Sequence, residues 1–418
     1  MSTNIFVEES IFINILRNTS YLIDMYIKGS AELPLHEGHV PPILLQYMKR
    51  LGKAIALYII DAFGPEKLVE KLSDPLWFQA FNNVIGMDWD SSGSTTVVLY
   101  VLKDFANIYT FNDIGIAVLG GKGEDSRNVV DELNILSKNS DVDADVFRYI
   151  SLLSAKIDGI ALQDGYSLYI HSLILSHNSL WTVVQQGMNT NTKMARRYHI
   201  HNNLTVEKDP HSGIACNSIN RAINLIDYTS KGVRKVIIDT ISSTSPNILI
   251  KNIADINRML KGNKSLEQWF RKSSGRDGLI YRDINHGENP LLYRPIVNMN
   301  RIEQTLHKLA EIKPSNFEEL LILRGVGAET IRALTLIADI IYGEKPSSKD
   351  PVTHPFDPFI YSYAHGGKDG VPYPIKLNVM KETIEFLEEA IEEAKIDAKI
   401  KRKALERLYK MFNEKAKQ

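Results

Sequence analysis

The chain contains a single cysteine, Cys216, among its 418 residues. One thiol excludes an intrachain disulfide and a zinc site built from several cysteines. Long apolar runs are also missing, because no stretch approaches the roughly 18 consecutive apolar residues that a membrane-spanning helix needs. The first residues, MSTNIFVEESIFINILRN, lack the basic start and small-residue cleavage site of a signal peptide. We therefore expect a cytoplasmic protein that does not enter the membrane.

An excess of one charge is absent as well. The 49 Lys and Arg residues are balanced by 50 Asp and Glu residues, which gives a net charge of −1. Proteins that coat nucleic acid without sequence preference are usually strongly basic. Any binding of DNA would therefore have to come from a local patch or from backbone amides.

The apolar pattern predicts an α+β fold with a small β-sheet. Residues 41–62 carry apolar side chains at helical spacing behind a pair of prolines, which predicts a helix. The segments YSLYIHSLIL and LWTVVQQG, joined by SHNS, predict a β-hairpin over residues 166–187. IGIAVLGGKG predicts a buried strand, and Ser94 is a candidate cap for a helix in a segment that also suits a strand.

Three domains follow from this pattern. We predict a mixed α+β domain that carries the chemistry, a mostly helical domain, and a Pro-rich loop leading into a long helix, over residues 1–225, 226–345 and 346–418. From Lys381 onward the apolar residues follow helical spacing. This last helix offers a surface for a homodimer.

The stretch EELLILRGVGAETIRAL, from Glu318 to Leu334, has the pattern of a helix–hairpin–helix. A first helix is expected at Phe317–Leu323 and a second at Glu329–Tyr342, with two glycines around a buried valine between them. The glycines permit close approach of a ligand, and the N-terminus of the second helix favours a phosphate oxygen. The residues expected to contact the DNA backbone are Arg324, Gly325, Val326, Gly327, Ala328 and Thr330.

This segment resembles the hairpin of DNA glycosylases and other repair proteins. Arg324 stands where such hairpins usually have proline. Glu329 stands where bifunctional glycosylases have their catalytic lysine, so lyase chemistry is not expected here. The resemblance places a catalytic carboxylate slightly before Asp350, which is more typical of the start of a loop.

A dense set of polar residues lies between residues 156 and 211. Asp158 and Asp164 precede the predicted hairpin, and Tyr169 and His171 are expected to share one face of its first strand, because residues two apart point the same way. If the strands pair, these groups converge at one end of the sheet. The expected catalytic set is Asp158, Asp164, His171, Gln185, Gln186, Arg196, Arg197 and His199.

These residue types suit hydrolysis of a phosphodiester. Asp158 and Asp164 are the expected ligands of Mg²⁺ or Mn²⁺, since such ions take few protein oxygens and keep several waters. The segment loosely resembles nucleases of the restriction-endonuclease type, but the acidic residue and lysine of their second strand are replaced by Gln185 and Gln186. The glycine loop LGGKGEDSR adds Lys122 and Arg127 as expected DNA contacts. In the alternative interpretation these polar groups have only a structural role and bond to one another and to nearby backbone.

Eight short motifs are spread along nearly the whole chain: LPLHEGHVPP, SDPLWFQAF, GGKGEDSR, LQDGYSLYIH, WTVVQQGMN, ARRYHIH, DPHSGI and AHGGKDG. In combination they resemble the domain of unknown function 763 family of archaea and bacteria. The resemblance implies that the polar motifs and the hairpin belong to one architecture. It implies no activity.

Three functions stay open from the sequence. The first is a metal-dependent nuclease of DNA repair or recombination. The second is a glycosylase that flips a damaged base into a pocket. The third is a DNA-binding protein without catalysis, in which the polar residues form a structural network.

Overall fold

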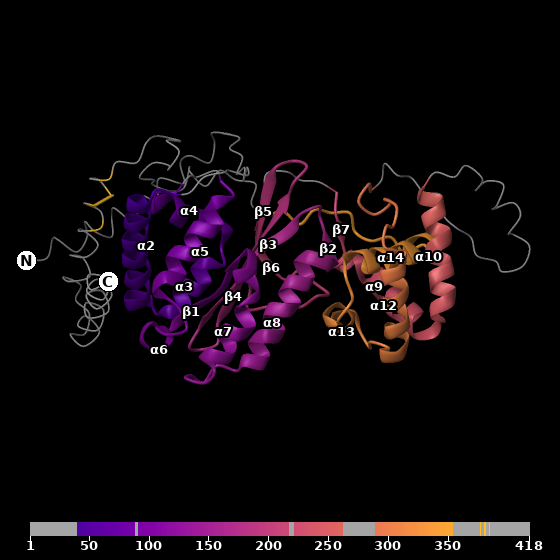
Figure 1. Ribbon diagram of the computed structural model, residues 1–418, viewed down its shortest axis with the longest axis horizontal. Helices are drawn as coiled ribbons and strands as arrows, with labels where there is room; N and C mark the ends of the chain where they lie inside the picture. Colours follow the sequence, from indigo (N-terminus) through magenta and orange to yellow (C-terminus); the bar gives the residue numbers. More distant parts are fainter. Residues whose placement is uncertain are drawn as a thin grey trace, which may run out of the picture.

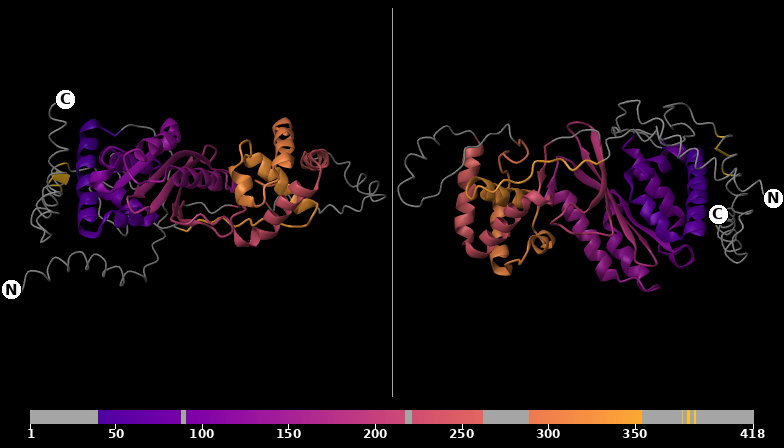
Figure 2. Two further views of the ribbon diagram at one scale, coloured as in Figure 1. Left: turned by 90° about the horizontal axis from the view of Figure 1, so that it is seen from below. Right: turned by 180° about the vertical axis from the view of Figure 1, so that it is seen from behind.

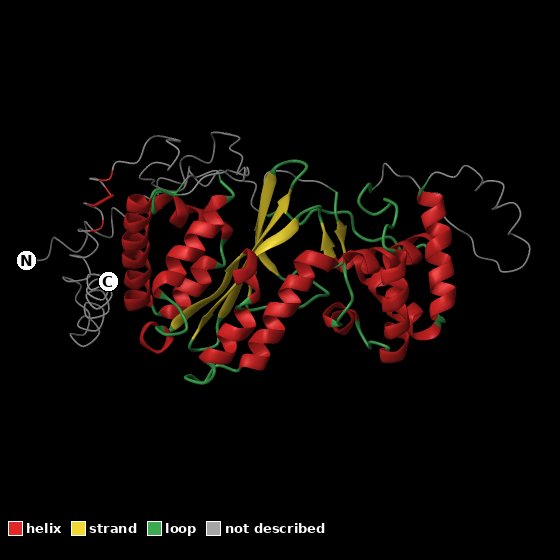
Figure 3. Cartoon of the chain, in the orientation of Figure 1, coloured by secondary structure: helices red, strands yellow, loops and turns green. Residues whose placement is uncertain are grey.

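A five-stranded antiparallel sheet lies in the middle of the molecule, with helices on both faces and a further group of helices beyond it (Figures 1 and 3). The computed structural model describes residues 40–87, 91–216, 221–261 and 289–353, together with Leu377, Met380, Lys381 and Ile384. The predicted loop at 261–276 lies outside the described residues beyond Lys261, as does nearly all of the predicted C-terminal helix.

The strand order in this sheet is β1-β3-β4-β5-β6, and every neighbouring pair is antiparallel. The strands are β1 (Ile116–Lys122), β3 (Ser167–Ser176), β4 (Trp181–Asn189), β5 (Met194–His201) and β6 (His211–Ala215). The predicted hairpin is confirmed as β3 and β4, and the predicted strand as β1. A second, two-stranded sheet pairs β2 (Leu162–Gln163) with β7 (Ile223–Asn224).

One face of the large sheet, here called the α5 face, packs against the N-terminal helices. They are α2 (Pro42–Phe63), α3 (Pro65–Leu72), α4 (Pro75–Val84) and α5 (Gly93–Phe105), followed by the short α6 (Phe111–Ile114). The prolines begin α2 as predicted. α5 is a helix despite its Thr-Thr-Val-Val run, because residues such as Val98 and Leu102 are buried in the cluster that covers this face. Ser92 precedes the helix, and Ser94 lies within its first turn.

The opposite face, here called the α8 face, packs against α7 (Val129–Leu136) and α8 (Ala144–Lys156). Asp143 caps α8 by accepting bonds from two backbone N–H groups of its first turn. α8 ends in a π-helical turn, η2 (Ile157–Ala161), which carries Asp158 toward the sheet. A 3₁₀ turn, η1 (Gly123–Arg127), leads from β1 to α7.

The described residues beyond 225 are mainly helical, as predicted. After the turn η3 (Tyr228–Ser230) come α9 (Lys231–Ser243), α10 (Pro246–Leu260), α12 (Met299–Ile312), α13 (Phe317–Ile322) and α14 (Ala328–Ile340). These helices form the end of the elongated molecule opposite α2, in all three orientations (Figures 1 and 2). Residues 330–340 of α14 are all buried, so this helix is the centre of the group.

A single buried apolar cluster joins the α8 face to these helices and passes through residues on both sides of position 225. The domain boundaries at 225 and 345 therefore stay predictions. Among the described residues, none of the helices combines the length and the apolar character needed to cross a membrane.

Candidate functional site

The polar residues singled out from the sequence lie in two networks, one on each face of the large sheet. Gln185 and Gln186 are neighbours in β4 and therefore point to opposite faces. In the strand register Gln185 lies beside His171 and Tyr198, whereas Gln186 lies beside Ile170 and Arg197. The sheet thus divides the cluster that was expected to converge at one end.

On the α8 face, Asp158 is the centre of a chain of hydrogen bonds. Its Oδ1 lies 2.6 Å from His211 Nε2, and its Oδ2 accepts a bond from the side-chain amide of Gln185. The other imidazole nitrogen of His211 bonds to Asp209, whose carboxylate is partly exposed. Burial alone would lower the pKa of His211, but the two carboxylates outweigh it and raise that pKa to about 10. Burial raises the pKa of Asp158 despite the imidazolium beside it.

The same chain continues through Gln185 to His171 and Ser151. Gln185 donates from its nitrogen to Asp158 and to the Ser154 carbonyl, so its Oε1 is the acceptor that lies 3.0 Å from His171 Nδ1. His171 therefore carries its proton on Nδ1, and its Nε2 accepts from the Ser151 hydroxyl at 2.7 Å. Burial lowers the pKa of His171 and keeps the ring neutral.

A second group on the α8 face surrounds the guanidinium of Arg196. Its Nη1 bonds to Asp164 Oδ2 at 2.8 Å, and the fork reaches both oxygens of Asp350 at 2.9 Å. The Tyr198 hydroxyl donates to the same oxygen of Asp164 at 2.7 Å, and the Tyr166 ring lies against the guanidinium. Asp350, which the glycosylase resemblance singled out, is thus a buried partner of Arg196.

On the α5 face, Gln186, Arg197 and His199 form the other network. Gln186 bonds to Thr95 of α5 and to the Ser92 carbonyl, and also contacts the Tyr169 hydroxyl. Arg197 Nε donates to His199 Nε2 at 3.0 Å, so the ring must hold its proton on Nδ1, which donates to the Leu72 carbonyl. This neutral form has both nitrogens engaged.

Arg197 has no carboxylate partner within ion-pair distance among the residues that the structure describes. Its remaining N–H groups bond to Gln79 and to the Pro75 carbonyl, and its guanidinium lies 4.5 Å from the centre of the Phe78 ring. Burial lowers its pKa to about 9. Neutral acceptors and an aromatic face therefore stabilise this cation in place of an opposite charge.

Tyr169 and His171 do not share a face, contrary to the prediction. A β-bulge lies between Leu168 and Ile170, and Tyr169 has no partner on β4. Tyr169 and Ile170 therefore both serve the α5 face, while His171 points to the α8 face.

As they stand, Asp158 and Asp164 are occupied by protein donors. No group of three or more His, Cys, Asp or Glu side chains in the described part of the chain is arranged to hold a metal ion. The expected site for Mg²⁺ or Mn²⁺ at these carboxylates stays a prediction.

Several residues joined to these networks were not assigned from the sequence, among them Ser151, Tyr198, Asp209 and His211. His211 and Asp209 belong to the motif DPHSG, and Tyr198 follows the two arginines of ARRYHIH. The alternation of side chains along β5 could have predicted the position of Tyr198, because it puts this residue on the same face of the sheet as Gln185. Ser151 lies in a helix distant in sequence, and no local pattern marks it.

α13 and α14 are joined by a tight turn that includes Arg324, Gly325 and Val326. Val326 is buried in the apolar cluster, whereas Arg324 is exposed. Gly325 has a φ of +103°, a left-handed value that favours glycine. Gly327 begins α14 with extended backbone and without a side-chain cap, and a Cβ added there would meet nothing within 4 Å.

Residues from three other segments hold this turn in place. The ammonium of Lys156, at the end of α8, lies 3.1 Å from the Val326 carbonyl, and burial lowers its pKa. Gln163 donates to the Ala328 carbonyl. Glu329 accepts bonds from the backbone N–H groups of Val297 and Asn298. The residue that stands in the place of the glycosylase lysine therefore makes a structural contact. Thr330 is buried.

Lys122 and Arg127, the other expected DNA contacts, are exposed at the end of β1 and in η1. β1 and η1 contact β3 and α7, whereas α13 and α14 contact α8, η2 and α9. Lys122 and Arg127 are therefore held by a different set of elements from the turn between α13 and α14.

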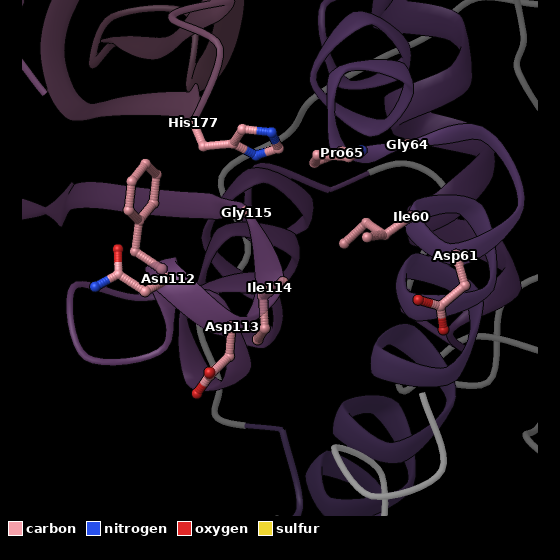
Figure 4. A pocket seen from close by; sticks show the side chains of 10 residues that line it. Ile60, Asp61, Gly64, Pro65, Asn112, Asp113, Ile114, Gly115 and His177 are labelled. Carbon is pink, nitrogen blue, oxygen red and sulfur yellow. The ribbon is translucent and has the colours of Figure 1, made fainter. Parts of the chain in front are cut away.

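A separate cleft of about 570 Å³ lies between the end of α2, the short α6 and the β3–β4 turn (Figure 4). Ile60 and Asp61 line it from α2, and Ile114 and His177 line it from the other side. None of the catalytic or DNA-binding residues expected from the sequence lines this cleft.

Comparison with known proteins places the chain in one family. No curated protein and no solved structure matches the sequence significantly. Residues 29–375 match the model of a family described as protein of unknown function (DUF763). Since the match covers most of the chain, the protein belongs to the DUF763 family.

Proposed function

We propose that this protein binds the backbone of DNA through the turn between α13 and α14, which would act as a helix–hairpin–helix. The observation that carries the proposal is the geometry of Gly325, Val326 and Gly327. The buried valine fixes the turn, the positive φ of Gly325 shapes it, and Gly327 leaves open space at the start of α14.

The first N–H groups of a helix have no partner within the helix and point outward with the positive end of its dipole. α14 has no side-chain cap, so a phosphate oxygen is a suitable acceptor for these groups. Arg324 is exposed beside them and supplies a positive charge. Such contacts read no base sequence, which agrees with a protein of nearly zero net charge.

The variant Gly327→Asp tests this proposal. Aspartate is a strong N-cap, and the position has extended backbone and free space, so the fold should keep or gain stability. Its carboxylate would bond to the N–H groups that the phosphate needs and would repel the phosphate. We expect affinity for a labelled duplex, measured by fluorescence anisotropy, to fall at least about tenfold.

Asn139→Asp is the matched control, because it adds the same charge at an exposed position after α7. It should leave affinity within about twofold. Arg324→Ala should lower the slope of log affinity against log salt by about one, as loss of one phosphate contact predicts. Equal binding by the parent and Gly327→Asp at every salt concentration would contradict the proposal.

Catalysis is a separate proposal. The partners of Asp158, Asp164, Arg196 and Arg197 favour the third possibility drawn from the sequence, a protein that binds DNA without cleaving it or excising a base, in which these four residues stabilise the fold. Labelled single-stranded, duplex, flap and deaminated DNA should be incubated with Mg²⁺, with Mn²⁺ and with EDTA. Metal-dependent strand breaks would support the nuclease, alkali-labile sites in EDTA would support the glycosylase, and no product would support a non-catalytic binder.

A further inference from the structure

The Ser151 hydroxyl does not make the bond that several other hydroxyl residues in the helices of this protein make. Thr240, Ser243 and Thr305 each donate to the carbonyl four residues earlier in their own helix, which is the usual bond of a helical Ser or Thr. The Ser151 hydroxyl instead bonds across to the imidazole of His171 on β3, at 2.7 Å.

The His171 ring is held in the form that accepts this proton. Its Nδ1 donates to Gln185 Oε1, so its Nε2 faces Ser151 as a neutral acceptor. Gln185 is itself fixed, because its amide nitrogen donates to Asp158 and to the Ser154 carbonyl. A hydroxyl, a base within hydrogen-bond reach and a third group that orients the base are the arrangement of an activated nucleophile.

We propose that Ser151 is a nucleophilic serine, with His171 as its general base and Gln185 as a positioning residue, acting on short acyl esters. This inference does not rest on binding of DNA. It concerns the α8 face, whereas the proposed DNA contact is the turn before α14.

The class of substrate follows from access and charge. Ser151 and His171 each keep only 8% of their surface exposed, so a slim group must reach the hydroxyl. The neighbouring glycine loop, whose Gly121 pairs with His171, carries Lys122 and Arg127 together with Glu124 and Asp125. Because these charges cancel in number, the loop offers no net attraction to an anion, and we choose an uncharged ester as the substrate.

The chemical step is balanced by the residues present and by water. Ser151 Oγ forms a bond to the acyl carbon while its proton moves to His171 Nε2, and the bond from that carbon to the alcohol oxygen breaks. The imidazolium returns the proton to the departing alcohol. Water then attacks the acyl-serine with His171 again as base, which releases the acid and restores the hydroxyl.

The test is covalent labelling by a small fluorophosphonate, read by intact mass and peptide mapping, alongside release of p-nitrophenol from its acetate ester. We expect one adduct, at Ser151, and an initial burst of p-nitrophenol. Ser151→Ala should lose both. Ser154→Ala is the control one turn along α8. Ser154 is 0% exposed, and its hydroxyl bonds to none of the residues that the structure describes. Alanine keeps the backbone carbonyl that accepts from Gln185, so the variant should label as the parent does.

His171→Gln separates the base from the fold, because an amide can still bond within the network. It should retain a melting temperature near that of the parent and lose at least about a hundredfold in labelling rate. The parent's rate should stay constant from pH 8 to below the usual imidazole range, since burial lowers the pKa of His171. Equal labelling of Ser151→Ala, or no labelling while a known serine hydrolase in the same tube reacts, would overturn the proposal.

Discussion

Replacement of Asp164 by alanine should destabilise the fold strongly. Its carboxylate accepts three bonds: from Arg196 at 2.8 Å, from the Tyr198 hydroxyl at 2.7 Å and from the Tyr166 N–H at 3.1 Å. The side chains of Asp164 and Arg196 are 1% and 0% exposed. Loss of one partner of a buried ion pair costs about 3–5 kcal/mol, because the other charge stays buried.

Two features set where in that range the variant should fall. Arg196 keeps its paired bonds to Asp350, which lowers the cost. The Tyr198 hydroxyl loses its acceptor in a site with no exposure, which adds about 1–3 kcal/mol. We expect a loss of about 4 kcal/mol in the free energy of unfolding, a large share of the roughly 5–15 kcal/mol that is typical of folded domains.

Urea unfolding followed by tryptophan fluorescence measures this loss. Asp164→Asn keeps an oxygen for Tyr198 and should cost about half as much. Asp141→Ala, at an exposed position, should stay within about 0.5 kcal/mol of the parent. If Asp164→Ala unfolds within 1 kcal/mol of the parent, with the same dependence on urea, the buried network does not stabilise the fold as argued. A loss of activity in Asp164→Ala is therefore informative only with its stability known.

Two further predictions concern His211 and Gly120. The pKa of His211 is about 10 in the folded protein, against a reference value of 6.5. The stability that protonated His211 contributes is therefore fully present below pH 6.5 and is lost as the pH rises to 10. Between these two values the free energy of unfolding should fall by about 1.4 kcal/mol for each unit of rising pH, and His211→Asn should remove this slope in urea titrations at several pH values. Gly120→Ala should cost at least about 3 kcal/mol, measured as the urea midpoint, because Gly120 has a φ of +80° and a Cβ would lie 2.4 Å from the His171 carbonyl oxygen. A pH slope unchanged in His211→Asn, or a parent-like midpoint for Gly120→Ala, would refute the respective argument.

The elements of this fold follow from local patterns in the sequence. The prolines and apolar spacing of residues 41–62 predict α2 to within a residue at each end, and SHNS marks the turn between β3 and β4. Ser94 shows the limit of such signals. Ser92 stands at the helix start, and burial against the sheet, rather than strand propensity, decides the conformation of the Thr-Thr-Val-Val run.

The residue types of the candidate site could also be named from the sequence, but their partners could not. Asp350 meets Arg196 across 154 positions, and His211 meets Asp158 across 53. Such pairs depend on how β-strands and loops are placed in three dimensions. The division into two networks follows from the alternation of β4, which separates two adjacent glutamines that the sequence suggested as one group.

The bulge at Tyr169 has a consequence for the evolution of this strand. Leu168 packs toward the α8 face, Ile170 toward the α5 face and His171 toward the α8 face, so these three residues alternate as if Tyr169 were not there. Tyr169 is therefore an inserted residue in structural terms. Relatives that lack it would keep every other strand position on its present face, and a one-residue gap in an alignment would belong at position 169. A deletion elsewhere in the strand would move a hydrophobic side chain into one network and a polar one into the core.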